Sequence, residues 1–236
     1  MPNYYPLMLD VRQRPALVVG GNRVAAEKAA ALNAAGAQVT VMNLEFCEEL
    51  QDLARQQQVT LRYKAYEDGD LAGAFVVVAA ATYEPELAQA IWREGQRNNQ
   101  LVNIVDVPAL CNFIVPSILR RGPLTIAVST EGSSPALAKH IRQHLEELFP
   151  SAYEGYMRLA SVVRTYLRQH GLSYDERDAF FGDFFRSDVL TLWIDEDEVE
   201  ALATTVRLLR RYKVDVSVAR ILDDLKEAEV PHESSR

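Results

Sequence analysis

A short apolar segment that ends in two glycines and leads into an alanine-rich helix constrains this chain most. It reads Ala16-Leu17-Val18-Val19-Gly20-Gly21-Asn22-Arg23-Val24-Ala25, and the alanine-rich stretch ends at Gly36. A run that is apolar on both faces is typical of a central parallel strand, and alanine is the strongest helix former. The pattern predicts a strand, a tight turn and a helix, which together begin a βαβ unit.

The same alternation of strand and helix continues to about residue 106. Apolar runs predict strands at 38–43, 60–66, 74–81 and 101–106, and helical patterns span 24–36, 48–57 and 84–98. Strands that alternate with helices argue for a parallel sheet covered on both faces. We therefore expect the α/β class, with a Rossmann-type domain over residues 1–112.

The pattern changes after residue 112. Residues 113–121 and 124–129 flank Gly122-Pro123 and predict two antiparallel strands, with Pro116 at an edge or a bulge. Ser134-Pro135 is typical of a helix start, and this helix should run to about Leu148. From residue 151 the pattern is helical, and an acidic run at 195–198 should begin a helix. We expect a small α+β dimerisation and substrate-binding segment, 113–150, and a helical region, 151–236.

Composition restricts the class of protein. The formal net charge is −8, which opposes non-specific binding to nucleic acid or to an anionic membrane surface. Two cysteines in 236 residues do not make a disulfide framework, so free thiols in or near the core are expected. The first residues lack a signal-peptide pattern and no apolar run reaches membrane-spanning length, so a cytoplasmic location is expected.

The turn after the first strand resembles a dinucleotide-binding fingerprint. Gly20, Asn22 and Ala25 fall on the three positions of G-x-G-x-x-G/A, and asparagine replaces the second glycine. At the end of the second strand Asn43 could bind a ribose hydroxyl, or could bond its own backbone instead. Because no Arg or Lys follows Asn43 directly, NAD is favoured over NADP. The predicted cofactor-binding residues are Gly20, Gly21, Asn22, Arg23, Val24, Asn43 and Ala80.

Asp106 follows the strand expected at 101–106. In an open parallel sheet the carboxyl ends of the strands face the ligand crevice, so this carboxylate could act as a base. The structural alternative is an aspartate that caps the following turn.

The chain resembles the precorrin-2 dehydrogenase and sirohydrochlorin ferrochelatase family, the N-terminal module of siroheme synthases. The segments that carry this resemblance are 5–10, 18–25 with Lys28, 102–106, and 113–117 continuing through 122–138. The resemblance implies a homodimer and NAD-dependent oxidation of precorrin-2 to sirohydrochlorin. It also implies that Asp106 is the general base, and some members insert Fe²⁺ as a second substrate.

By the same resemblance, two residues depart from the family pattern, Asn22 and Glu131, each standing where relatives carry glycine. The tetrapyrrole has many carboxylates, so local cations are needed, and Arg120, Arg121, Lys139 and Arg142 cluster in the implicated region. The predicted substrate-binding residues, placed between the Rossmann domain and segment 113–150, are Asn103, Arg120, Ser129, Thr130, Ser133, Ser134 and Lys139.

Three alternatives stay open on the sequence alone. The chain could be a nucleotide-sensing Rossmann module that performs no chemistry, or a chelatase or scaffold that has lost dehydrogenase activity. His140 and His144 share one helix face at i and i+4, a spacing that can bind metal. Because no accompanying Glu completes a zinc motif, we expect a helix surface or a dimer seam there and assign no metal ligand.

Overall fold

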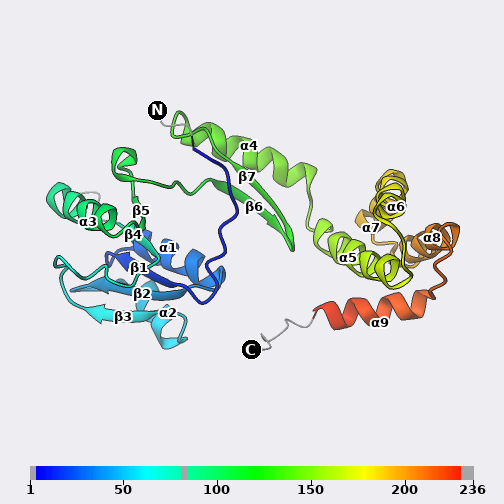
Figure 1. Cartoon of the computed structure of the whole chain (residues 1–236), viewed down its shortest axis with the longest axis horizontal. Coiled ribbons are helices and arrows are strands. Elements are labelled where there is room, and N and C mark those ends of the chain that lie inside the picture. Colours follow the sequence, from blue (N-terminus) through cyan, green and yellow to red (C-terminus); the bar gives the residue numbers. More distant parts are fainter. Residues whose placement is uncertain (1–3, 81–83, 230–236) are drawn as a thin grey trace. The chain divides into compact units, whose positions relative to one another are not determined.

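The computed structural model describes residues 4–80 and 84–229 and divides the chain into two compact units (Figure 1). The first unit runs to Val115 and includes Glu131–Ser133; the second holds Pro116–Thr130 and the chain from Ser134 onward. Each unit has buried clusters of its own. The expected three-part division, 1–112, 113–150 and 151–236, stays a prediction.

The first unit is a parallel sheet of five strands in the order β3-β2-β1-β4-β5, as expected for a Rossmann-type domain. The order reverses between β1 and β4, which is where such sheets bind ligands. The strands are β1 Pro15–Val19, β2 Gln38–Asn43, β3 Thr60–Tyr63, β4 Val76–Ala79 and β5 Leu101–Ile104. The helices are α1 Arg23–Ala34, α2 Glu48–Arg55 and α3 Pro85–Arg97, and a short 3-10 helix spans Pro108–Leu110.

The sheet is apolar on both faces because each face is covered. Side chains alternate along a strand, so Ala16 and Val18 of β1 pack in the cluster that contains residues of α1 and α2. Leu17 and Val19 pack on the opposite face, in the cluster that contains Ile91 of α3. The unbroken apolar run in β1 is therefore explained by burial on both sides.

Three strands of this sheet are shorter than the sequence indicates, and one of them is the fifth, which was expected over 101–106 and ends at Ile104. The third, expected over 60–66, ends at Tyr63, and the chain beyond it forms a loop tied by ion pairs between Lys64 and both Glu67 and Asp70. The fourth, expected over 74–81, spans only Val76–Ala79, and residue 81 lies outside the described residues. In each case the strand-like sequence pattern continues beyond the last hydrogen bonds of the sheet, so the pattern overestimates the length of the strand.

The second unit begins with a two-stranded antiparallel sheet, β6 Ser117–Arg121 and β7 Leu124–Val128. The first of these strands, β6, was expected to begin at residue 113, and this expectation was wrong. Pro116 has no N–H to contribute to a ladder, and the residues before it contact β5 instead. The following helix α4, Pro135–Leu148, starts as predicted, with Ser134 accepting a hydrogen bond from the N–H of Leu137.

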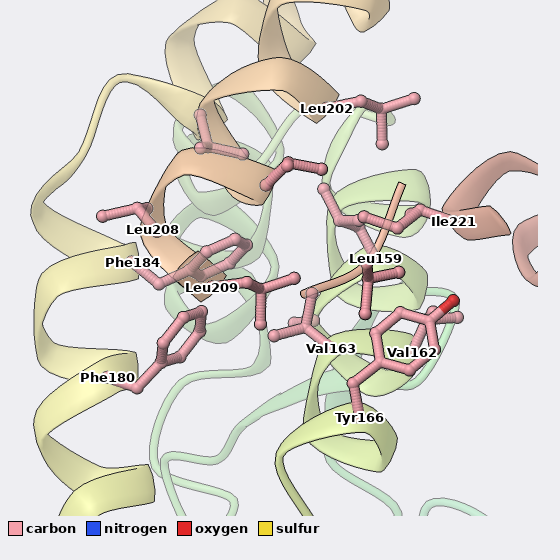
Figure 2. Close-up of a cluster of buried hydrophobic side chains, with 14 of the residues drawn as sticks. Leu159, Val162, Val163, Tyr166, Phe180, Phe184, Leu202, Leu208, Leu209 and Ile221 are labelled. Carbon is pink, nitrogen blue, oxygen red and sulfur yellow. The ribbon is translucent and has the colours of Figure 1, made fainter. Parts of the chain in front are cut away.

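Five helices complete the second unit: α5 Tyr153–Gln169, α6 Tyr174–Arg186, α7 Val189–Ile194, α8 Glu198–Arg211 and α9 Val218–Glu229. Figure 2 shows the core that they share, in which side chains from α5, α6, α8 and α9 converge. Phe184 stacks on Tyr156 with ring centroids 5.3 Å apart. The acidic run begins α8 as expected, because the Asp197 carboxylate accepts from the N–H of Glu200.

Candidate active site

The turn between β1 and α1 is built from small residues in close contact. Gly20 has φ +140°, a conformation that side chains rarely adopt, and a Cβ on it would lie 3.1 Å from the Ala80 Cβ. The same added atom would lie 3.5 Å from the Cβ of Ala25. Gly20, Ala25 and Ala80 therefore bring the ends of β1 and β4 together with the start of α1, as the fingerprint predicts.

Gly21 lacks a side chain for a reason that the sequence did not indicate. A Cβ there would lie 1.8 Å from the backbone oxygen of Glu45 and 2.4 Å from Asn43 Nδ2. The Gly21 carbonyl also accepts a hydrogen bond of 2.7 Å from the N–H of Cys47. Gly21 thus holds the segment after β2 against the turn, and its contact with cofactor stays a prediction.

Asn22 does not need the freedom of glycine, although the dinucleotide-binding fingerprint has glycine at this position. Its backbone is extended, with φ −91° and ψ 178°, and its Oδ1 accepts from the N–H of Ala25 at the start of α1. Among the described residues, no acceptor engages the N–H groups of Arg23 and Val24. The first turn of α1 contains no carboxylate. Free N–H groups at a helix start suit a phosphate, so this turn fits the pyrophosphate of a dinucleotide.

Asn43 is the last residue of β2, and its side chain performs the backbone-bonding role that we considered as the alternative. Nδ2 donates to the Glu45 carbonyl at 2.7 Å. This bond leaves Oδ1 as an acceptor that no described donor reaches, so it can still accept from a ribose hydroxyl. The two roles are therefore compatible.

The structure brings two cationic residues near Asn43. They are distant from it in the sequence, so the sequence pattern did not indicate them. Arg62 lies on β3 and Lys64 directly follows this strand, and the Lys64 N–H donates to the Asn43 carbonyl. Both side chains are held by Asp70, at 2.9 Å each, and the Asp70 side chain is only 7% exposed. Burial raises the pKa of Asp70, but hydrogen bonds from Lys64 and the Glu67 N–H, with both cations, lower the pKa overall.

Asp106 lies two residues beyond β5, at the carboxyl edge of the sheet where Gly20 and Ala80 also lie. The N–H of Val105 donates to Ala79, which places the Asp106 turn beside the end of β4. Asp106 is exposed and has φ +61°, inside a turn closed by the bond from Val107 N–H to the Ile104 carbonyl. Aspartate tolerates this left-handed conformation better than most residues, but it is still strained.

Asn103 on β5 uses its amide internally. Nδ2 donates to the Phe113 carbonyl at 3.0 Å and contacts Cys111 Sγ at 3.7 Å. The sequence analysis did not anticipate a role for Cys111 or Asn112, which line the outer edge of β5. No local pattern pointed to them, because most of these contacts join residues seven to twelve positions apart.

The other predicted substrate residues fall in two groups. Ser133 belongs to the first unit, and the rest belong to the second: Arg120, Ser129, Thr130, Ser134 and Lys139. Thr130 Oγ1 accepts from the Ser134 N–H, so both residues help to start α4.

The four cations of this region differ in availability. Arg120 and Lys139 are exposed, and neither forms an ion pair with a described residue. Arg121 donates to the Phe149 carbonyl, and Arg142 pairs with Glu146.

Glu131 adopts a left-handed backbone, the conformation that favours glycine. Its φ is +51°, and Gly132 follows with φ +86°. Two successive left-handed residues favour glycine at both positions, because a Cβ in this region costs roughly 1–2 kcal/mol. Glu131 therefore adopts the backbone that glycine would adopt.

Two further observations concern metals and membranes. The His140 and His144 rings lie 4.5 Å apart on exposed positions of α4, and within the described residues no three His, Cys, Asp or Glu side chains gather as metal ligands would. None of the helices described has the length and apolar character to cross a bilayer.

Comparison with known proteins agrees with this geometry. Residues 7–117 match the family described as "Putative NAD(P)-binding", and residues 121–148 match "Sirohaem biosynthesis protein central". Siroheme synthase from Methylobacillus flagellatus is 39% identical over 181 residues, which are 77% of this chain and 38% of that protein. This chain is a member of the siroheme synthase and precorrin-2 dehydrogenase family.

Further members extend the likeness to the fold. Siroheme synthase from Ectopseudomonas mendocina is 38% identical over 79% of this chain and 40% of its own length. The solved structure of "SirC, precorrin-2 dehydrogenase" superposes with a TM-score of 0.69 at 25% identity, covering 89% of this chain and 99% of that one. The chain spans about two fifths of the length of these synthases. The family resemblance, the Rossmann-type fold and a nicotinamide dinucleotide site are thus confirmed.

Proposed function

We propose that this protein oxidises precorrin-2 to sirohydrochlorin with NAD⁺ as hydride acceptor. The observation that carries the proposal is the shared edge of the sheet at which the Gly20 turn, Ala80 and the Asp106 turn all lie. A dinucleotide seated on α1 and crossing the ends of β1 and β4 would reach this carboxylate. The match to a precorrin-2 dehydrogenase over most of the chain supports the substrate.

We assign a separate role to each group of residues according to its position in the fold. The N–H groups of Arg23 and Val24 bind the pyrophosphate, and Gly20 with Ala80 allows its close approach. NAD⁺ held there would supply the acceptor for a hydride from a ring carbon of the substrate. Asp106 accepts the proton that leaves in the same oxidation, so that two electrons and two hydrogens depart in total. Arg120 and Lys139 are our candidates to neutralise substrate carboxylates, with Ser129, Thr130, Ser133, Ser134 and Asn103 as hydrogen-bonding partners.

An anaerobic assay with precorrin-2 and NAD⁺ tests this function. Sirohydrochlorin and NADH should appear together in equal amounts, each followed by its own absorbance. Binding of NAD⁺ with no turnover would instead identify a sensing module. A parallel reaction with sirohydrochlorin and Fe²⁺, without NAD⁺, tests the metal insertion that some relatives perform; turnover there alone would identify a chelatase.

We infer NAD rather than NADP as the cofactor from the neighbourhood of Asn43. Its Oδ1 suits a ribose hydroxyl, and the two nearby cations are held by Asp70. We expect kcat/KM for NAD⁺ to exceed that for NADP⁺ by at least about tenfold. The 2′-phosphate of NADP⁺ would find no available cation at this position, and a tenfold difference corresponds to about 1.4 kcal/mol of binding free energy.

Asp70→Asn should weaken this preference by freeing Arg62, whereas Lys64 keeps its ion pair with Glu67. One screened ion contact contributes about 1 kcal/mol, so the NADP⁺/NAD⁺ ratio of kcat/KM should rise about fivefold. Asp68→Asn is the matched control, because Asp68 lies in the same loop but pairs with Arg97. Equal use of both cofactors by the unaltered protein would contradict the inference.

We further propose that two copies associate through the second unit. Leu137, Ile141 and Leu148 on α4 are 48%, 37% and 67% exposed, and Ile118 on β6 is 36% exposed. These exposed apolar residues lie on two elements that pack together. Light scattering at micromolar concentration should give twice the chain mass, and Ile141→Glu should shift it toward the monomer. Lys139→Glu, on the same helix, keeps the apolar residues and should stay dimeric; a monomeric unaltered protein would contradict the proposal.

A further inference from the structure

The outer edge of β5 is closed by side chains instead of by another strand. β5 is the last strand of its sheet, so one row of its N–H and C=O groups has no neighbouring strand. Unpaired backbone groups of this kind cost free energy when they are shielded from water. After the loop 105–110 the chain returns along this edge at residues 111–113.

Asn112 satisfies three of these backbone groups. Its Oδ1 accepts from the Val102 N–H and its Nδ2 donates to the Gln100 carbonyl, both at 2.8 Å. Its own backbone N–H donates to the Val102 carbonyl at 3.0 Å. A single asparagine thereby reproduces the donor and acceptor pattern of a strand.

Cys111 contacts the next backbone groups along the same edge. Its Sγ accepts from the Ile104 N–H at 3.2 Å and lies 3.3 Å from the carbonyl oxygens of both Ile104 and Val107. Burial raises the pKa of the Cys111 thiol, so the thiol keeps its proton. The S–H group can then donate a hydrogen bond to one of these two carbonyl oxygens. A raised pKa also argues against a nucleophilic thiolate at this position.

The two residues that Cys111 holds are the ends of the turn that carries Asp106. The hydrogen bond from Val107 to Ile104 closes this turn, and Asp106 occupies it with φ +61°. A strained backbone persists only where its surroundings fix it. The Cys111 thiol supplies that fixation on the side of β5, and Asn112 anchors the neighbouring chain to β5 through Gln100 and Val102.

We propose that Cys111, supported by Asn112, is a positioning residue for Asp106: it clamps the Ile104–Val107 turn and so fixes where the carboxylate points. This inference rests on the proposed role of Asp106 as the base. It assigns to the thiol a task in catalysis that involves no contact with substrate or cofactor.

Cys111→Val and Cys111→Ser separate positioning from volume. Valine fills nearly the same space without hydrogen bonds, whereas serine can still donate and accept. We expect Cys111→Val to lower kcat about tenfold or more at an unchanged Kd for NAD⁺, because small displacements of a catalytic group are costly. Cys111→Ser should stay within about threefold of the unaltered protein. Fluorescence of Trp92 on α3 verifies that the first unit is folded.

The Asp106→Asn background tests whether the effect passes through Asp106. There, Cys111→Val should cause no further loss of kcat, since coupled residues are not additive. An equal loss in both backgrounds, or an unaffected kcat in Cys111→Val, would overturn the proposal.

Hydrogen exchange of the Val107 amide gives a readout that needs no enzymatic turnover. Cys111→Val should accelerate this exchange at least about tenfold, and Cys111→Ser should not, because only valine releases the turn. If the unaltered protein does not oxidise precorrin-2, the proposed function fails while this measurement still tests the clamp. Equal exchange in all three proteins would disprove the clamp whatever the activity.

Discussion

Asp106→Asn is expected to lower kcat for precorrin-2 oxidation by about 10²–10⁴, the usual contribution of a positioned general base. Asparagine is the informative substitution because it tolerates the left-handed backbone that Asp106 adopts at φ +61°. The turn should therefore persist, and the loss should report the carboxylate alone. The Kd for NAD⁺ should change less than about threefold, since the pyrophosphate is predicted to bind at the start of α1.

The measurement combines stopped-flow turnover with NAD⁺ titration of the same preparation. Asp68→Asn serves as the control, because it removes an exposed carboxylate of the same unit that pairs with Arg97. A kcat within threefold of the unaltered value would remove Asp106 from the chemistry. A large fall in NAD⁺ affinity would show instead that the carboxylate supports the cofactor.

Gly21→Ala is expected to destabilise the first unit by about 3 kcal/mol and to abolish NAD⁺ binding. The added Cβ would lie 1.8 Å from a backbone oxygen, so the segment after β2 must move. Overpacking against backbone costs about 1–3 kcal/mol or more. The segment after β2 also packs against the turn between β1 and α1, through the hydrogen bond from Cys47 to Gly21. Its displacement should therefore move the N–H groups at the start of α1 out of the positions that bind the pyrophosphate.

The two tryptophans allow the units to be followed separately. Trp92 lies on α3 and Trp193 on α7, so a Trp193→Phe background reports the first unit alone during urea unfolding. Gly182→Ala is the matched control: it lies within α6, and the nearest atom to its new Cβ is the end of the flexible Arg186 side chain at 3.2 Å. That change should leave the Trp92 transition of the first unit unaltered, and with Trp193 intact the second unit should be unchanged or stabilised by about 0.5–1 kcal/mol. Unaltered urea unfolding of Gly21→Ala would refute the steric argument.

The sequence was sufficient for the succession of elements and the parallel sheet of the first unit because its central strands are buried on both faces. Such strands appear as unbroken apolar runs, and β1 and β4 stand out in this way. Local capping patterns were equally informative: Ser134 and Asp197 begin α4 and α8 as predicted. Both kinds of signal lie within a few residues, where periodicity and capping chemistry operate.

The features that escaped prediction depend on contacts between distant segments. The sequence indicated Gly21 as a residue that lets a phosphate approach the backbone. In the structure a side chain is excluded there by the backbone of Glu45, which follows a different strand. Lys64 comes beside Asn43 through the β2–β3 register. Cys111 looked only like a thiol near the core. In each case the partner is fixed by the fold and is not encoded by a local pattern.

The way the sheet ends has a consequence for the newly made chain. An open strand edge can recruit a strand from another molecule and start aggregation, so proteins protect such edges. Here a single asparagine amide and a thiol occupy the rim of β5. The opposite rim, β3, has only four residues and carries Arg62. Each border of the sheet thus offers little to a neighbouring polypeptide during synthesis, and at β5 the thiol that gives part of this protection also holds the Asp106 turn.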